Sequence, residues 1–141
     1  MTCKDFHNKC DNKGPTICLY KNEKGYIFGG YCPISWMSHE NGKWFKNDES
    51  FIFTLTNIHG PEPTKFPHNK GEDSIKHHKN QGPTFDDFYI EDDYSNSQCT
   101  IYFPRGHKDI LGKGKSIFSD DSKNNVDKTK IKDIEVFQVF K

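Results

Sequence analysis

The apolar residues of this chain are gathered into short runs rich in aromatic and β-branched side chains, and polar turn residues end each run. Such runs are too short for the helices of a bundle but are typical of β-strands. Only a short polar loop ending in glycine separates the first two runs, which predicts a β-hairpin. The runs that we expect to form strands are 16–20, 25–28, 51–56, 65–67, 74–77, 88–90, 99–103 and 131–140.

Many short strands with little helix between them predict a mainly β fold of α+β type, an antiparallel β-sandwich with a few short peripheral helices. One helix is expected over residues 3–10, where three apolar side chains fall on one helical face. The run 131–140 is apolar on both faces, so we expect it to be a central strand. The polar segment 112–130 predicts a surface loop.

The length of 141 residues suits one domain. Its core must be largely aromatic, because the sequence has 12 Phe and 6 Tyr but only 32% hydrophobic residues. Twenty basic residues balance twenty acidic ones, and Arg105 is the only arginine. Nucleic-acid-binding proteins usually carry a basic excess and use arginine, so no nucleic-acid partner is expected. No apolar run could span a bilayer, so no integral membrane segment is expected.

Five cysteines at irregular spacing predict free thiols rather than a disulfide framework, and hence a cytoplasmic protein. A thiol-based, peroxide-handling enzyme is one alternative function, with Cys32 or Cys10 as the reactive group. The sequence has no C-x-x-C, no H-E-x-x-H and no zinc-finger spacing. We therefore predict no metal site and no cofactor, and assign no catalytic residue.

A β-sandwich that binds a carbohydrate or another ligand is a further alternative. Trp44, Tyr94 and Tyr102 suggest it, because they are aromatic residues near predicted loops. Side chains of this kind more often pack at the rim of a core. The sequence does not indicate which surface would bind a protein partner.

Two adjacent glycines, Gly29 and Gly30, interrupt the aromatic stretch GYIFGGYCPISW. They lack the G-x-G-x-x-G spacing of a dinucleotide site, and Pro33 follows in place of a helix. Glycine inside a strand usually marks a bulge or a close approach to the backbone. We therefore expect an aromatic side chain, rather than a ligand, to pack against the backbone here.

Six short motifs follow one another along nearly the whole chain: Phe6-His7-x-x-Cys10, Gly14-Pro15-Thr16-Ile17, Gly25 to Tyr31 with Trp36, Asp48-x-x-Phe51 to Asn57, Gly82-Pro83-x-Phe85, and Ile131-x-x-Ile134-Glu135-Val136-Phe137. Their order resembles the TLDc domain family (TBC/LysM-associated domain, oxidation-resistance proteins). The resemblance implies a β-sandwich flanked by short helices and a link to protection against oxidative stress. It also implies a protein partner, since several members bind the vacuolar-type proton-pumping ATPase.

No settled catalytic mechanism comes with this resemblance, so we expect residues 1–141 to form a single non-enzymatic protein-interaction domain. Two features depart from the family pattern. Members usually have a helix and a strand before the Phe-His motif, so this domain is expected to lack them, which would leave a sheet edge open. In addition, Asp86 and Asp87 follow Phe85 where the family typically has a glycine, which sets this loop apart.

Overall fold

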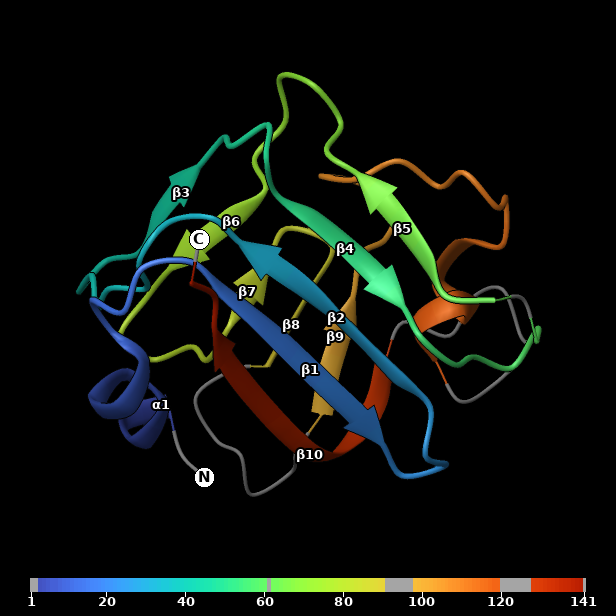
Figure 1. Cartoon of the computed structure of the whole chain (residues 1–141), viewed down its shortest axis with the longest axis horizontal. Coiled ribbons are helices and arrows are strands. Elements are labelled where there is room, and N and C mark those ends of the chain that lie inside the picture. The colour runs from blue at the N-terminus through green and yellow to red at the C-terminus, as the bar shows by residue number, and fades with distance from the viewer. Residues whose placement is uncertain (1–2, 61, 91–97, 120–127, 141) are drawn as a thin grey trace.

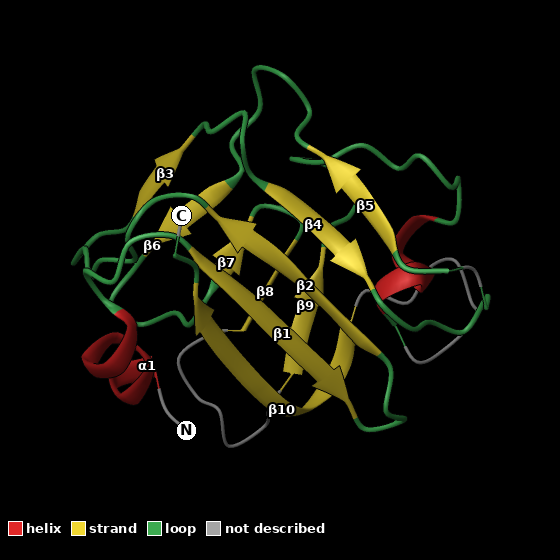
Figure 2. Cartoon of the chain, in the orientation of Figure 1, coloured by secondary structure: helices red, strands yellow, loops and turns green. Residues whose placement is uncertain are grey.

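The computed structural model describes residues 3–60, 62–90, 98–119 and 128–140, and the structural statements below concern these residues. They form one α-helix, one 3₁₀ helix and ten strands (Figure 2). In chain order the elements are α1 (Cys3–Cys10), β1 (Thr16–Asn22), β2 (Ile27–Cys32), β3 (Lys43–Phe45), β4 (Phe51–Thr54), β5 (Thr64–Pro67), β6 (Ile75–His77), β7 (Thr84–Phe85), β8 (Phe88–Ile90), β9 (Gln98–Ile101), η1 (Gly114–Phe118) and β10 (Lys128–Gln138).

The strands form one antiparallel sheet in the order β3-β6-β7-β8-β9-β10-β1-β2-β4-β5. The sheet curls strongly, so its two halves face each other (Figure 1). We call β1, β2, β4, β5 and the C-terminal part of β10 the β1 half, and β3, β6, β7, β8 and β9 the β9 half. The mainly β prediction is confirmed. The sheet is continuous, however, in place of the two separate sheets predicted for a sandwich.

Strand β10 makes the sheet continuous, because its two ends pair with different partners. Lys128–Lys130 pair with β9, and Ile131–Gln138 pair with β1. The central position predicted for this strand is therefore confirmed. The reason given for it was wrong, since Phe137 is 50% exposed and Phe140 is 84% exposed. The length of β10, rather than burial of both its faces, places it between the two halves.

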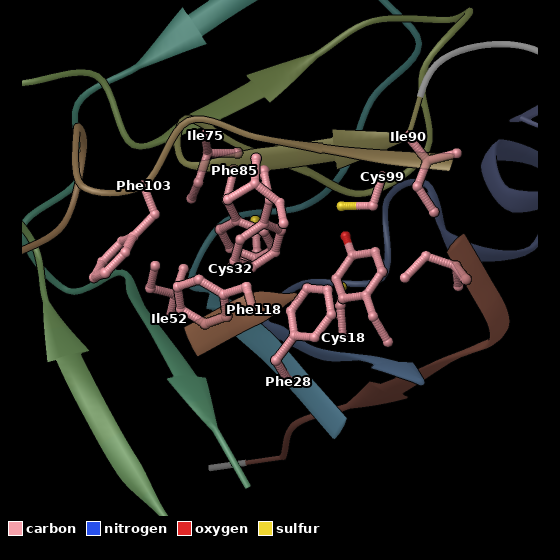
Figure 3. Close-up of a cluster of buried hydrophobic side chains, with 14 of the residues drawn as sticks. Cys18, Phe28, Cys32, Ile52, Ile75, Phe85, Ile90, Cys99, Phe103 and Phe118 are labelled. Carbon is pink, nitrogen blue, oxygen red and sulfur yellow. The ribbon is translucent and has the colours of Figure 1, made fainter. Parts of the chain in front are cut away.

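Aromatic rings fill the space between the two halves, as the composition predicted. The ring centroids of Phe28 and Phe88, from opposite halves, lie 5.0 Å apart. Phe118 of η1 completes this contact, with centroids 5.4 and 5.3 Å from those two rings. Figure 3 shows Phe28, Phe118 and neighbouring side chains as one cluster, with Cys18, Cys32 and Cys99 among them. Each fully buried phenylalanine contributes about 1.5–3 kcal/mol of transfer free energy.

Several short elements lie where the sequence predicted loops. The predicted loop 112–130 contains η1, whose Phe118 is buried, and its last residues begin β10. Strands β3 and β7 were not predicted, because they have only three and two residues and show no periodicity. The strand expected over 99–103 ends at Ile101. The predicted helix over 3–10 is α1, and no described helix is long and apolar enough to cross a membrane.

The paired glycines allow aromatic packing on both faces of β2, as predicted. A methyl group at Gly30 would overlap the ring of Phe85 on the core side. At Gly29, a methyl group would overlap the carbonyl oxygen of Cys18 and lie 2.9 Å from the ring of Phe53. Both positions therefore require glycine, because neighbouring atoms approach the β2 backbone too closely to leave room for a side chain.

Candidate functional site

A groove on the outer face of the β9 half is the best candidate for a binding site. It is open to solvent and has a volume of about 200 Å³. Its lining combines three aromatic rings with two cations and two neutral polar side chains: Trp44, Tyr89, Tyr102, Lys76, Arg105, Gln81 and Thr84.

Strand alternation directs these side chains outward. Trp44 in β3 is paired with Lys76 in β6, which is paired in turn with Thr84 in β7. Their neighbours Ile75 and Phe85 point inward and are fully buried. Because successive side chains in a strand point to opposite faces, the row from Trp44 to Thr84 faces away from the core, although Thr84 itself is covered by its neighbours.

Each cation of the groove lies over an aromatic ring. The Lys76 ammonium is 5.2 Å from the centroid of Trp44, and the Arg105 guanidinium carbon is 4.5 Å from that of Tyr102. Tyr102 is stacked on Tyr89 with centroids 5.7 Å apart. Trp44 and Tyr102 remain 38% and 37% exposed, so both can contact a ligand.

Arg105 is held in place by the turn between β7 and β8. Its Nε donates a hydrogen bond to Asp86 Oδ2 at 3.0 Å, and its Nη2 donates to Asp86 Oδ1 at 2.7 Å. Nη2 also donates to the Asp86 carbonyl oxygen at 3.1 Å. The hydrogen bonds to Asp86 raise the pKa of Arg105, while burial raises the pKa of Asp86. The pair fixes the guanidinium over Tyr102.

The adjacent aspartate fixes the backbone of the same segment. Asp87 is fully buried and accepts hydrogen bonds from the backbone N–H groups of Gly106 and His107, at 2.5 and 3.0 Å. Asp86 and Asp87 are the two residues that the sequence analysis set apart from the pattern of the family that the chain resembles. Both carboxylates bind the segment that carries Arg105.

A polar acceptor in the groove has no hydrogen-bond partner within the described residues. The Oε1 atom of Gln81 is buried and unpaired. The hydroxyl of Thr84, in contrast, donates to the carbonyl oxygen of Gly82 at 3.0 Å. This atom has almost no accessible surface, so a molecule in the groove could reach it only after the Gln81 side chain moves.

One cluster resembles the catalytic triad of serine hydrolases, because a serine contacts a histidine that contacts an aspartate. This cluster is buried. Ser50 Oγ is 3.2 Å from His107 Nε2, and His107 Nδ1 is 3.5 Å from Asp87 Oδ2. All three side chains are buried, and the Ser50 hydroxyl also donates to the Asn47 carbonyl oxygen at 2.8 Å. A substrate cannot reach Ser50, so we interpret the cluster as a structural brace between β4 and the segment carrying Arg105.

The thiols proposed for peroxide chemistry do not have the environment of a reactive cysteine. Cys32 is fully buried, and burial raises its pKa to about 12. Burial also raises the pKa of Cys10, which is only half-buried. Reactive cysteines have a lowered pKa and solvent access. The same cause raises the pKa values of Cys18 and Cys99, and all five cysteines are free thiols.

The described residues contain no group of three or more histidine, cysteine, aspartate or glutamate side chains that could hold a metal ion. Of the residues suggested for ligand binding, Trp44 and Tyr102 meet in the groove, and Tyr94 lies outside the described residues. The sequence analysis missed Lys76, Tyr89 and Arg105. Alternation within 74–77 and 88–90 could have placed Lys76 and Tyr89 on the outer face.

The chain is similar to known proteins at the level of the family and of one curated relative. A sequence model of the TLDc domain family matches residues 1–140. The MTOR-associated protein MEAK7 of Danio rerio is 43% identical over 47 residues. That stretch is 33% of this chain and 10% of the zebrafish protein, so the chain spans a small part of this relative's length.

Proposed function

The chain belongs to the TLDc domain family, and on this premise we propose that it is a non-enzymatic protein-interaction domain that binds its partner through the groove. One observation carries the proposal: the groove presents Trp44, Tyr102 and Arg105 together at the surface. Tryptophan, tyrosine and arginine are the residues most enriched at the energetic centres of protein interfaces.

The geometry of the groove favours binding in two ways. The aromatic side chains offer large contact areas and lose few rotatable bonds when they are immobilised. Arg105 is already fixed by Asp86, so little of its freedom remains to be lost on binding. Lys76 adds a positive charge beside Trp44, which favours an acidic segment of the partner and speeds encounter.

We further propose that the partner is the vacuolar-type proton-pumping ATPase and that the domain acts in the cytoplasm in protection against oxidative stress. The family resemblance supports this choice, because several members bind that pump. The zebrafish relative is named for its association with another protein, MTOR, which agrees with an interaction role. The raised pKa values of the buried thiols favour this role over direct thiol chemistry.

The test is retention of the pump by the immobilised chain. Wild type and the Trp44→Ala variant are incubated with detergent-solubilised vacuolar membranes, and pump subunits are detected with antibodies. Ile110→Ala is a matched control, because Ile110 is 57% exposed and does not line the groove. We expect wild type and Ile110→Ala to retain similar amounts of the pump. The amount retained by Trp44→Ala should be lower by about tenfold or more.

Two outcomes contradict the proposal. If wild type retains no pump subunits, the partner is wrong. If wild type and Trp44→Ala retain the pump equally, the groove is not the binding surface.

Carbohydrate binding is a second candidate function, favoured by the presence of Trp44 and Tyr102 in the lining of one groove. Aromatic faces stack on sugar rings, and both side chains are partly exposed. Trp36 is buried in the core, so tryptophan fluorescence would report chiefly on a ligand at Trp44. Titration with a panel of oligosaccharides tests this candidate, which requires a saturable change that Tyr102→Ala abolishes while Trp44 remains as the reporter.

A further inference from the structure

The outer face of the β1 half is apolar, which is unusual for the solvent-facing side of an antiparallel sheet. The inward positions of these strands carry core residues such as Cys18, Phe28 and Ile52. Alternation therefore turns a second set of large apolar side chains outward: Ile17, Leu19, Tyr31, Phe51, Phe53 and Phe137. We call this set the outer apolar face.

No described helix or loop covers the outer apolar face. In Figure 1 the strands β10, β1, β2 and β4 lie in front, and the described chain does not cross over them. Except for Phe53, the six side chains keep part of their surface exposed, and Phe137 is 50% exposed. The ring of Phe53 packs against the backbone at Gly29, close to the sheet. The face extends into a hollow of about 180 Å³ bordered by Leu19, Ile27, Lys21, Asp133 and Glu135.

The strand register arranges the face in straight rows across five strands, with β2 in the middle. One row has an acid at one end and a base at the other: Glu135, Leu19, Gly29, Phe53 and Lys65. The next row is apolar throughout: Phe137, Ile17, Tyr31, Phe51 and Pro67.

These rows are complementary to themselves. A two-fold axis parallel to β2, lying in the plane between two copies, would bring each row against its own reverse. Glu135 then faces Lys65 of the second copy, and Leu19 faces Phe53 of the second copy. Tyr31 lies near the axis and faces its own equivalent. Such an isologous contact is the commonest arrangement in homo-oligomers.

The charged ends of the row are available for this contact. Among the described residues, neither Glu135 nor Lys65 has an ion-pair partner. The Lys65 ammonium lies 4.1 Å from the ring centroid of Phe51, so it is held over the face. Five strands at the usual spacing give a face of roughly 400 Å², in the range of functional patches on single chains.

We propose that the outer apolar face binds a second copy of this chain, forming a two-fold symmetric dimer with the sheets packed face to face. Aligned sheets pack about 10 Å apart with interdigitating side chains, and the rows supply the apolar centre and the charged ends. The interface is small, so the dimer is expected to dissociate at micromolar concentration. This inference is independent of the groove, which lies on the β9 half.

Sedimentation velocity over about 5–200 μM tests the proposal, because a dimer of this interface size should appear within that range. Glu135→Lys and Lys65→Glu each place like charges opposite each other, so each should weaken dimerisation by roughly tenfold or more. The double variant exchanges the two charges and should restore the wild-type dissociation constant to within about threefold. Trp44→Ala, which alters the groove alone, should dimerise like wild type.

Circular dichroism and thermal unfolding serve as the control that each variant is folded. Folding should be retained, because Glu135 and Lys65 are both exposed. Leu19→Glu is a second way to disrupt the apolar centre and should sediment as a monomer. A wild-type chain that stays monomeric throughout the range overturns the proposal. A dimer that is insensitive to the single exchanges, or one that the double exchange does not restore, overturns it as well.

Discussion

Asp86 and Arg105 form a forked pair, with side-chain hydrogen bonds of 3.0 and 2.7 Å, at the border between core and surface. The Asp86 side chain is 8% exposed, whereas that of Arg105 is 45% exposed. The carboxylate is thus anchored inside the fold and directs the guanidinium outward over Tyr102. The only arginine of the chain is therefore the residue that links the β7–β8 turn to the candidate binding site.

The variant Asp86→Asn should lower both stability and partner binding. It removes a charged acceptor from Arg105, and hydrogen bonds to charged groups contribute roughly 1.5–3 kcal/mol. In urea unfolding, the free energy of unfolding should fall by an amount at the lower end of this range, because Arg105 is partly exposed and its charge is screened by solvent. Arg105→Lys keeps the charge but cannot form the fork, so it should weaken binding with a smaller loss of stability. Unchanged binding in both variants would remove Arg105 from the interface.

The variant Gly30→Ala should destabilise the core, because its methyl group would overlap the ring of Phe85. Overpacking of this kind costs roughly 1–3 kcal/mol. Combining it with Phe85→Leu should cost less than the sum of the two single changes, since the smaller side chain makes room. Gly29→Ala should have no such rescue, because its methyl group meets the carbonyl oxygen of Cys18. Strict additivity of Gly30→Ala and Phe85→Leu in urea unfolding would contradict this account.

The longest strands and the packing at the glycines could be predicted from the sequence, because both depend on local pattern. Runs such as 16–20 and 51–56 alternate or carry β-branched and aromatic residues, and they became β1 and β4. The pair Gly29 and Gly30 could be interpreted from their position between aromatic residues. These features need no knowledge of which strands become neighbours.

The continuous sheet and the groove could not be predicted in this way. Whether β10 pairs with one strand or with two depends on contacts between segments far apart in the chain. The groove is built on short strands: β3 and β7 have only three and two residues and show no periodicity, and the predicted strand 74–77 does not indicate which strands become its neighbours. Trp44 and Tyr102 were recognised as candidates, but only the fold shows that they share one site.

The thiols of the folded chain should react slowly near neutral pH. Burial raises the pKa of Cys32 to about 12, which lowers its thiolate fraction roughly a thousandfold relative to its ordinary value. A chromogenic disulfide reagent at pH 7.5 should therefore modify the half-buried Cys10 first and the others only on unfolding. Cys10→Ser should remove this first phase. A rapid phase that persists in Cys10→Ser but disappears in Cys32→Ser would support the peroxide-handling alternative.

A buried histidine should make the protein less stable in mild acid. His77 in β6 is 1% exposed, and neither ring nitrogen has a hydrogen-bond partner within the described residues. Its ring is packed against Phe45 and Trp36, with centroids 4.6 and 5.3 Å away. Burial, aided by the nearby charge of His39, lowers the pKa of His77 from 6.5 to about 4.

The sign follows from proton binding. Between pH 6.5 and about 4, the unfolded chain binds a proton at His77 and the folded chain does not. Stability is therefore complete above pH 6.5 and falls as the pH is lowered through this window. The full difference of 6.5 − 4 = 2.5 pKa units corresponds to about 3 kcal/mol.

Urea unfolding of wild type should show about 2.5 kcal/mol of this loss between pH 7.5 and 4.5. The variant His77→Phe keeps a ring of similar size without the titrating group, so it should lack this part of the loss. If the two proteins lose the same stability between these pH values, His77 is not the buried group responsible.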